Sequence, residues 1–236
     1  MSEWEPKRFW NAATVAEVAG GYTVHLDGRP VRTPAKAPVT LPTHALAAAI
    51  AGEWDAQVEK IVPASMPVTR AANAAIDKVA HQQAEVARML ADYGDSDLLC
   101  YRAESPVELT ARQAEAWDPL LDWAESELSA RLETRTGIMP RPQDPRTLDR
   151  LHNEVRMLDF WALTAFHDLV GISGSLIIGF AALRDIYPAR TLWRISMLDE
   201  TWQQEQWGSD EDAERVARRK ENDFINAKRF HDLSRV

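Results

Sequence analysis

Apolar and polar residues alternate with a period of two in the first part of the chain. Residues 22–26 follow this pattern, which is typical of a half-buried β-strand. An Asp-Gly pair comes directly after them and favours a tight hairpin turn, so residues 30–33 are expected to return as a second strand. Residues 14–18 and 38–41 are further short strands by the same reasoning. The first forty residues therefore predict a small sheet.

After residue 42 the spacing of apolar residues changes to that of an α-helix. Thr43 is a suitable N-cap, and apolar residues at every third or fourth position predict one helix over residues 43–61. The rest of the chain shows only helical patterns. The expected helices are residues 67–92, 105–132 (opened by a capping pair, Ser105 and Glu108), 144–169, 176–183, 188–208 and a last helix capped by Ser209.

These patterns predict the α+β fold class. We expect a small β-rich N-terminal domain over residues 1–66, which includes the helix 43–61, followed by a larger all-helical C-terminal domain over residues 67–236. Residues 176–183 are apolar on every side, so they are expected to form the central buried helix of that domain. A chain of 236 residues is long enough to bury a sizeable core.

Charge and cysteine content exclude several classes of partner and site. The formal net charge is −9, and residues 1–80 contain 8 acidic and 8 basic side chains, so the negative excess lies in residues 81–236. This charge argues against nucleic acid and anionic membranes as partners. The single cysteine excludes an internal disulfide. No apolar run is long enough to span a bilayer, and the N-terminus resembles no targeting signal, which predicts a cytoplasmic protein without membrane insertion.

The sequence contains little that indicates catalysis. Glycine-rich phosphate loops are absent, and the six histidines do not have metal-ligand spacing, so we expect no catalytic residue, cofactor or metal. The pair His167 and Asp168, or carboxylates near Glu200, leaves open a small hydrolase-like enzyme, although ordinary surface acids explain these residues more simply. A generic scaffold with an acidic helical surface is a further alternative.

Aromatic residues supply the candidates for partner binding. Most of the nine tryptophans should be buried, but Trp4 and Trp10 lie in a segment without periodicity, where an exposed Trp often marks a contact surface. A second group surrounds residue 200, where an acid and an amide at positions i and i+3 share one helix face. The predicted partner-binding residues are Phe9, Trp10, Asp199, Glu200, Gln203 and Trp207.

Seven short motifs occur in order between residues 7 and 212. They are KRFW (7–10), LDGRPVRTP (26–34), EWDAQ (53–57), MPVTR (66–70), DLLCYR (97–102), WDPLL (117–121) and the group LDE, WQ and WG (198–208). Each motif is weak alone, but the ordered set is specific. Together they resemble the family of assembly chaperones of the ATP synthase catalytic head, F1-ATPase, which hold its α subunit.

The resemblance implies a chaperone and no enzyme. Such a protein would bind the unassembled α subunit, shield its β-facing surface and release it during ATP synthase assembly. The functionally important acid of the family falls on Glu200. Members are known from mitochondria and from α-proteobacteria, and this sequence fits a bacterial cytoplasmic member. An unassembled apolar surface aggregates, and a protein that holds it needs aromatic anchors rather than catalytic groups. We expect a monomer, because the binding surface must stay free.

Overall fold

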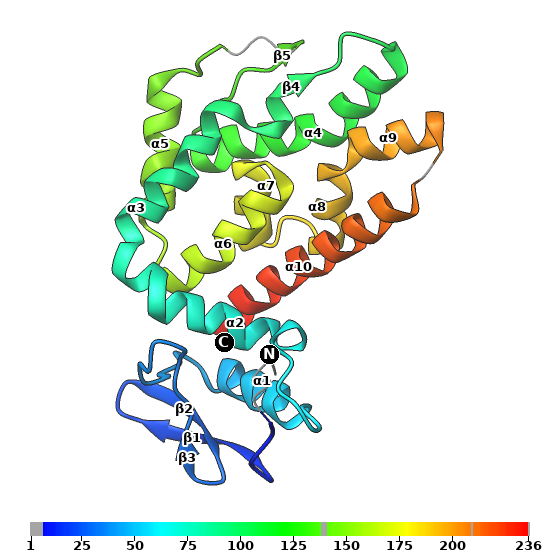
Figure 1. Cartoon of the computed structure of the whole chain (residues 1–236). Helices are drawn as coiled ribbons and strands as arrows, with labels where there is room; N and C mark the ends of the chain where they lie inside the picture. The colour runs from blue at the N-terminus through cyan, green and yellow to red at the C-terminus, as the bar shows by residue number, and fades with distance from the viewer. Residues whose placement is uncertain (1–6, 138–140, 209, 236) are drawn as a thin grey trace. The chain divides into compact units, whose positions relative to one another are not determined.

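The computed structural model describes residues 7–137, 141–208 and 210–235, and the chain divides into two compact units (Figure 1). Unit 1 comprises Met1–Gln82, Phe160–Ala165 and Arg229–Val236, and unit 2 comprises Gln83–Asp159 and Phe166–Lys228. The boundary expected between residues 66 and 67 therefore lies inside unit 1. Unit 1 also includes two short segments from late in the chain, which no local pattern indicates.

Unit 1 begins with an antiparallel three-stranded sheet in the order β1 (Ala13–Val18), β2 (Gly21–Leu26) and β3 (Arg29–Pro30). The turn between β2 and β3 has positive φ at Asp27 and Gly28, as expected for a two-residue Asp-Gly hairpin. The strand expected over residues 38–41 is absent. Isolated bridges instead join Arg32 to Pro38 and Tyr22 to Leu41.

The helix after the sheet, α1 (His44–Asp55), is capped as predicted, because the backbone N–H of Leu46 donates to Oγ1 of Thr43 at 3.0 Å. It ends at Asp55 rather than at residue 61. Beyond it, the buried Gln57 side chain accepts from the N–H of Val62 at 2.7 Å and so holds a loop. Val58, expected on the apolar helix face, is 82% exposed.

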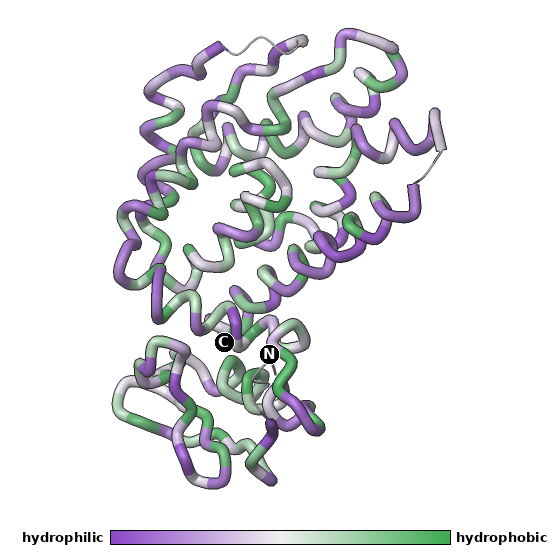
Figure 2. Tube along the Cα trace, viewed as in Figure 1, coloured by the Kyte–Doolittle hydropathy of each residue, from purple (hydrophilic) through white to green (hydrophobic). Residues whose placement is uncertain are grey.

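The core of unit 1 lies between the sheet and its helices, where hydrophobic positions gather (Figure 2). Members from far along the chain, Trp161 and Phe230, belong to the same cluster as Val24 and Leu46. The helical stretch expected over residues 67–92 is present as η1 (Pro63–Ser65), α2 (Pro67–Ala74), the π-helix η2 (Ala75–Val79) and α3 (Ala80–Ala91).

Unit 2 is largely helical, as predicted. After the short turns η3 (Asp92–Ser96) and η4 (Leu98–Cys100), its helices are α4 (Val107–Leu128), α5 (Pro145–Arg156), α6 (Phe160–Ser173), α7 (Leu176–Leu183), α8 (Ala189–Ser196), α9 (Leu198–Trp207) and α10 (Glu211–Arg235). The first residues of α6 and the last residues of α10 belong to unit 1. Every residue of α7 is buried, which confirms the expected central helix.

Several details of unit 2 differ from expectation. The stretches 144–169 and 188–208 each form two helices, and the chain also contains a short parallel ladder, β4 (Tyr101–Arg102) with β5 (Arg135–Thr136). Pro106 occupies the N-cap of α4 without a side-chain bond, so the predicted capping pair is wrong. Ser209 lies outside the described residues. None of the described helices combines the length and apolar composition that crossing a bilayer requires.

Candidate functional site

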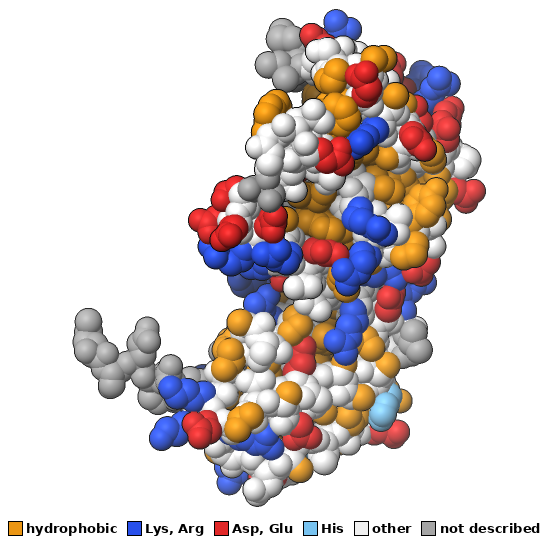
Figure 3. Space-filling view, turned by 90° about the vertical axis from the view of Figure 1, so that its right-hand side faces the viewer, with side chains coloured by type: hydrophobic (Ala, Val, Ile, Leu, Met, Phe, Trp, Pro, Cys, Tyr) orange, Lys and Arg blue, Asp and Glu red, His pale blue; other side chains and the backbone are white. Residues whose placement is uncertain are grey.

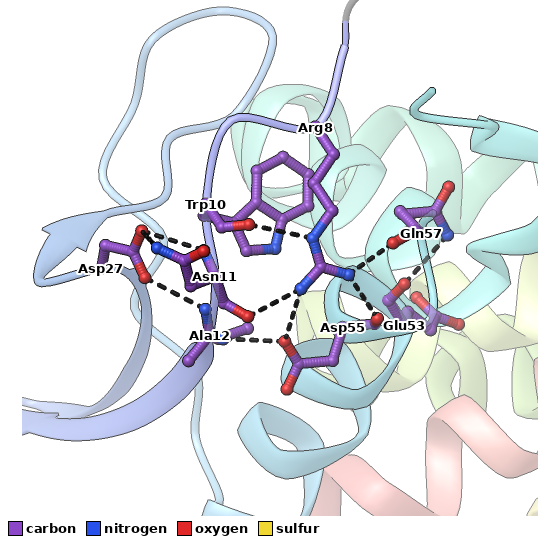
Figure 4. A network of polar contacts seen from close by, with 9 residues as sticks. Arg8, Trp10, Asn11, Ala12, Asp27, Glu53, Asp55 and Gln57 are labelled. Atoms are coloured by element: carbon purple, nitrogen blue, oxygen red, sulfur yellow. Dashed lines mark hydrogen bonds and ion pairs between the residues drawn. The ribbon is translucent and has the colours of Figure 1, made fainter. Parts of the chain in front are cut away.

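Arg8 of the first motif ties the segment before β1 to the loop after α1 (Figure 4). Its guanidinium donates to the backbone carbonyls of Trp10 at 2.9 Å, Asn11 at 2.8 Å, Asp55 at 2.7 Å and Gln57 at 2.5 Å. Four carbonyl acceptors use most of its planar set of donors. The side chain of Arg8 therefore stabilises the fold.

Asp27 of the second motif fixes the hairpin turn to the same segment. Its carboxylate accepts from the backbone N–H of Asn11 at 2.9 Å and of Ala12 at 3.0 Å (Figure 4). These two N–H groups favour the charged form and lower the pKa of Asp27. The motif thus encodes a turn with its own anchor.

Glu53 of the third motif binds the fourth. Its two carboxylate oxygens accept from the backbone N–H of Val68 at 2.8 Å and of Thr69 at 2.7 Å, in the first turn of α2. A carboxylate at a helix N-terminus satisfies free N–H groups and complements the helix dipole. Hydrogen bonds therefore join the motifs at residues 53–57 and 66–70.

Asp97 of the fifth motif is fully buried and caps the central helix. Its oxygens accept from the backbone N–H of Leu99 and of Ile177, both at 3.0 Å. Burial in an apolar surrounding raises the pKa of Asp97, although these hydrogen bonds oppose the shift. The carboxyl group joins η4 to the start of α7.

Arg102 links the fifth and sixth motifs. Its guanidinium forms an ion pair with Asp118 at 2.7 Å and lies 5.3 Å from the ring centre of Trp117. Trp117 is buried and donates its indole N–H to the carbonyl of Ile195 at 3.0 Å. Five of the first six motifs thus contain a charged residue that stabilises the fold, whereas Arg70 of the fourth motif is exposed, and that motif is held through its backbone.

One face of α9 is held against α4. Asp199 accepts from the side-chain amide of Gln113 at 2.8 Å, and the guanidinium of Arg112 lies 4.9 Å from the ring centre of Trp202. Arg112 also forms an ion pair with Glu205 at 2.7 Å. Asp199, a predicted partner-binding residue, is therefore partly buried and positions α9.

Another face of α9 carries three motif residues that are exposed. Glu200, Gln203 and Trp207 follow one another at intervals of three and four, so they lie on one side of the helix, and Trp207 is 79% exposed. Within the described chain, no hydrogen bond or ion pair engages the side chain of Glu200 or of Gln203. We name these three residues the α9 stripe. Figure 3 shows the side of unit 2 with α9 and α10, where hydrophobic side chains lie among acidic and basic ones.

The two aromatic candidates near the N-terminus also differ in exposure. Phe9 is 68% exposed, whereas Trp10 is 3% exposed and belongs to the core of unit 1. The Trp10 ring packs edge-on against Phe9 at 5.1 Å and against Trp54 at 5.2 Å between ring centres. The expectation that Trp10 is an exposed contact residue is therefore not met, and Trp10 instead supports Phe9.

The pair His167 and Asp168, suggested for catalysis, lies on the surface of α6. His167 and Asp168 are both exposed on α6, 3.0 Å apart, and their hydrogen bond raises the pKa of His167. Two open cavities of unit 2 have volumes of about 610 and 450 Å³, and Glu200 lines neither of them, although Asp199 lines the smaller one together with Gln113. Within the described residues, no three potential metal ligands converge. His167 and Asp168 therefore form a surface pair on α6.

Known proteins match this chain over much or all of its length. The family model of the ATP12 chaperone protein matches residues 7–125. "Protein atp12, mitochondrial" of Schizosaccharomyces pombe is 29% identical over 222 residues, which are 89% of this chain and 76% of that protein. The crystal structure of Atp12 from Paracoccus denitrificans is 50% identical, with a TM-score of 0.95 over 99% of this chain and all of that one. A variant of the same protein with one aspartate changed to lysine has a TM-score of 0.96.

Proposed function

Because the chain belongs to the ATP12 chaperone family, we propose that it binds the unassembled α subunit of F1-ATPase and shields the surface that later meets the β subunit. The subunit is released when β arrives. The family predicted from the seven motifs is thereby confirmed, whereas the α subunit as the client is our proposal. A chaperone of this kind acts by binding, without a chemical step.

One observation supports the proposal more than any other. Five of the first six motifs contain a charged residue that forms hydrogen bonds or an ion pair within the fold, but the α9 stripe presents Glu200, Gln203 and Trp207 to solvent. Residues of a family motif that do not support the fold are candidates for contact with a partner. An exposed Trp beside an acid and an amide combines a large apolar anchor with polar groups, as the centres of protein interfaces do.

The chemistry of the stripe indicates what the client presents. Trp207 would enter an apolar depression, and Glu200 would accept from a basic side chain or from backbone N–H groups. Truncation of an interface Trp at such a centre typically costs about 2–4 kcal/mol. Reversing the charge of Glu200 would replace an attraction by a repulsion and would affect specificity as well as affinity.

Capture of the α subunit tests this proposal. The tagged chain is produced in cells that overproduce the α subunit without β, and the α subunit that co-purifies is quantified. We expect wild type to capture it, and Glu200→Lys and Trp207→Ala to reduce capture at least tenfold with unchanged circular dichroism. Matched controls on exposed sites of unit 2, Glu85→Lys and Met157→Ala, should behave as wild type.

Two outcomes would count against it. If wild type captures no α subunit, the client is wrong. If both stripe variants capture as much as the controls, the α9 stripe is not the contact. We expect the free protein to be a monomer, which light scattering measures. The matched yeast relative is called mitochondrial, and the cytoplasm of a bacterium remains our prediction for this chain.

A further inference from the structure

β1 forms one edge of the sheet of unit 1. It pairs with β2 from Ala13 to Val18, and the order of the sheet is β1-β2-β3. An edge strand exposes a row of backbone N–H and C=O groups that can pair with another extended chain. Proteins usually block such edges with proline, bulges or charges. β1 contains no proline, and Glu17 is its only charged residue.

The register shows which backbone groups of β1 point outward. The N–H of Asp27 donates to the carbonyl of Ala12 at 3.1 Å, and bonded pairs in an antiparallel ladder recur every second residue. Thr14, Ala16 and Val18 are therefore bonded to β2. The opposite side of β2 confirms this parity, since Tyr22 and Val24 pair with Leu41 and Val31 there.

Three residues of β1 consequently direct their backbone groups away from β2. The N–H of Ala13 donates to the carboxylate of Asp55 at 2.9 Å. In the part of the chain that the structure describes, the outward backbone N–H and C=O groups of Val15 and Glu17 have no hydrogen-bond partner. The side chain of Val15 packs against the core of unit 1, so the open edge continues a buried apolar face.

We propose that an extended segment of the client polypeptide adds to β1 as a further strand, pairing with Val15 and Glu17. This inference rests on the proposed function, because it assumes a polypeptide client. The segment would present an apolar side chain toward the face of Val15, and a basic side chain near Glu17 would be favoured. When a strand adds to a sheet edge, the backbone hydrogen bonds provide affinity, and every second side chain of the added strand provides specificity.

The first residue of β1 is linked to another segment that the motifs mark. Asp55, which accepts from Ala13, also offers its backbone carbonyl to Arg8, the residue before the exposed Phe9. The start of β1 is therefore linked through Asp55 to the segment that carries this exposed aromatic. A second copy of this chain is a poorer occupant. An open edge from residue 15 to 17 provides about four hydrogen bonds, and such pairing buries far less than the roughly 1,200 Å² of a stable interface.

Proline at position 17 tests the proposal directly. Glu17→Pro removes an outward N–H and leaves the bonds to β2 in place, and edge strands tolerate proline where the N–H faces solvent. Glu17→Ala is the matched control, since it removes the charge and keeps the N–H. In the capture assay with the α subunit overproduced without β, we expect Glu17→Pro to bind about tenfold more weakly than Glu17→Ala, as the loss of one backbone hydrogen bond predicts.

Hydrogen exchange on wild type gives a second readout that does not depend on the folding of a variant. The amides of Val15 and Glu17 should exchange rapidly in the free protein and become protected in the complex with the α subunit. Equal capture by a folded Glu17→Pro, or rapid exchange of both amides in the complex, would overturn the proposal. So would protection in the free protein that rises with its concentration, which would identify a second copy as the occupant. Failure of wild type to capture the α subunit would instead refute the proposed function.

Discussion

Asp97 provides the sharpest test of the distinction between motif residues that support the fold and those that contact a client. It is fully buried, and its carboxyl group accepts from the backbone N–H of Leu99 and of Ile177, each at 3.0 Å. Asp97→Ala leaves both donors buried without these acceptors. Each unsatisfied donor costs about 1–3 kcal/mol. The variant also no longer buries a carboxyl group, and the desolvation cost that it avoids offsets part of this loss. We expect a net loss of about 3 kcal/mol in the free energy of unfolding.

Thermal unfolding followed by circular dichroism measures this effect. In a chain of this length, about 3 kcal/mol corresponds to a fall of roughly 6–12 °C in Tm. Asp149→Ala, which removes an exposed acid from α5, is the control and should change Tm by about 1–2 °C. At a temperature where both variants are folded, Asp97→Ala should still capture the α subunit. A Tm equal to that of wild type would refute the capping role.

The pH dependence of stability gives an independent check on Asp97. Burial raises its pKa in the folded state above the ordinary value of 3.8. Its stabilising contribution is therefore complete below that value and is lost as the pH rises through the folded-state pKa. Asp97→Asn removes the titration. The stability of wild type relative to Asp97→Asn should decrease as the pH rises from about 4. An increase over this range would show that the carboxylate is bound preferentially in its charged form.

Three further predictions follow from local geometry. Gly179→Ala should lower the free energy of unfolding by about 1–3 kcal/mol in denaturant titrations, because a Cβ would lie 2.7 Å from a methyl group of α6. Gly171→Ala is the control, and it should raise this free energy by up to about 1 kcal/mol, because a Cβ there would meet open space. Equal effects of the two variants would contradict the prediction. His167 should titrate above 6.5 in NMR spectra and return toward that value in Asp168→Asn; an unchanged titration would show that the hydrogen bond is not the cause. Glu53→Ala should cost about 2–3 kcal/mol, measured by Tm, because two N–H groups of α2 lose their acceptor; an unaltered Tm would exclude the cap.

Local patterns predicted much of the fold. The hairpin, the N-cap at Thr43 and the buried helix α7 all depend on neighbouring residues, and all are present. The end of α1 was not predictable in this way. Val58 continues the helical spacing, but the side chain of Gln57 bonds to Glu53 and Val62 and stabilises a loop instead.

Long-range pairings were missed for a related reason. The ladder of β4 and β5 joins residues 101 and 135, and two-residue strands have no periodicity to detect. The assignment of residues 160–165 and 229–236 to unit 1 depends on contacts of Trp161 and Phe230 with a core that is distant in the sequence. Spacing alone carries no information on such contacts.

The candidate site shows a similar division. The motifs indicated segments for a contact surface but could not show which of two neighbouring residues is exposed. Asp199 bonds to Gln113 while Glu200 is exposed, and Trp10 is buried while Phe9 is exposed. Only packing distinguishes the members of each pair. Among the six predicted contact residues, Trp10 is buried and Asp199 bonds within the fold, so the exposed candidates are Phe9 and the α9 stripe.

Photo-crosslinking from the centre of the α9 stripe tests the account most directly. Gln203 is replaced by p-benzoylphenylalanine in cells that overproduce the α subunit without β, and Glu85 on α3 receives the same group as a control. Irradiation should join the α subunit to position 203, not to position 85. Co-purification of the α subunit without a crosslink at position 203 would contradict the claim that this stripe holds the client.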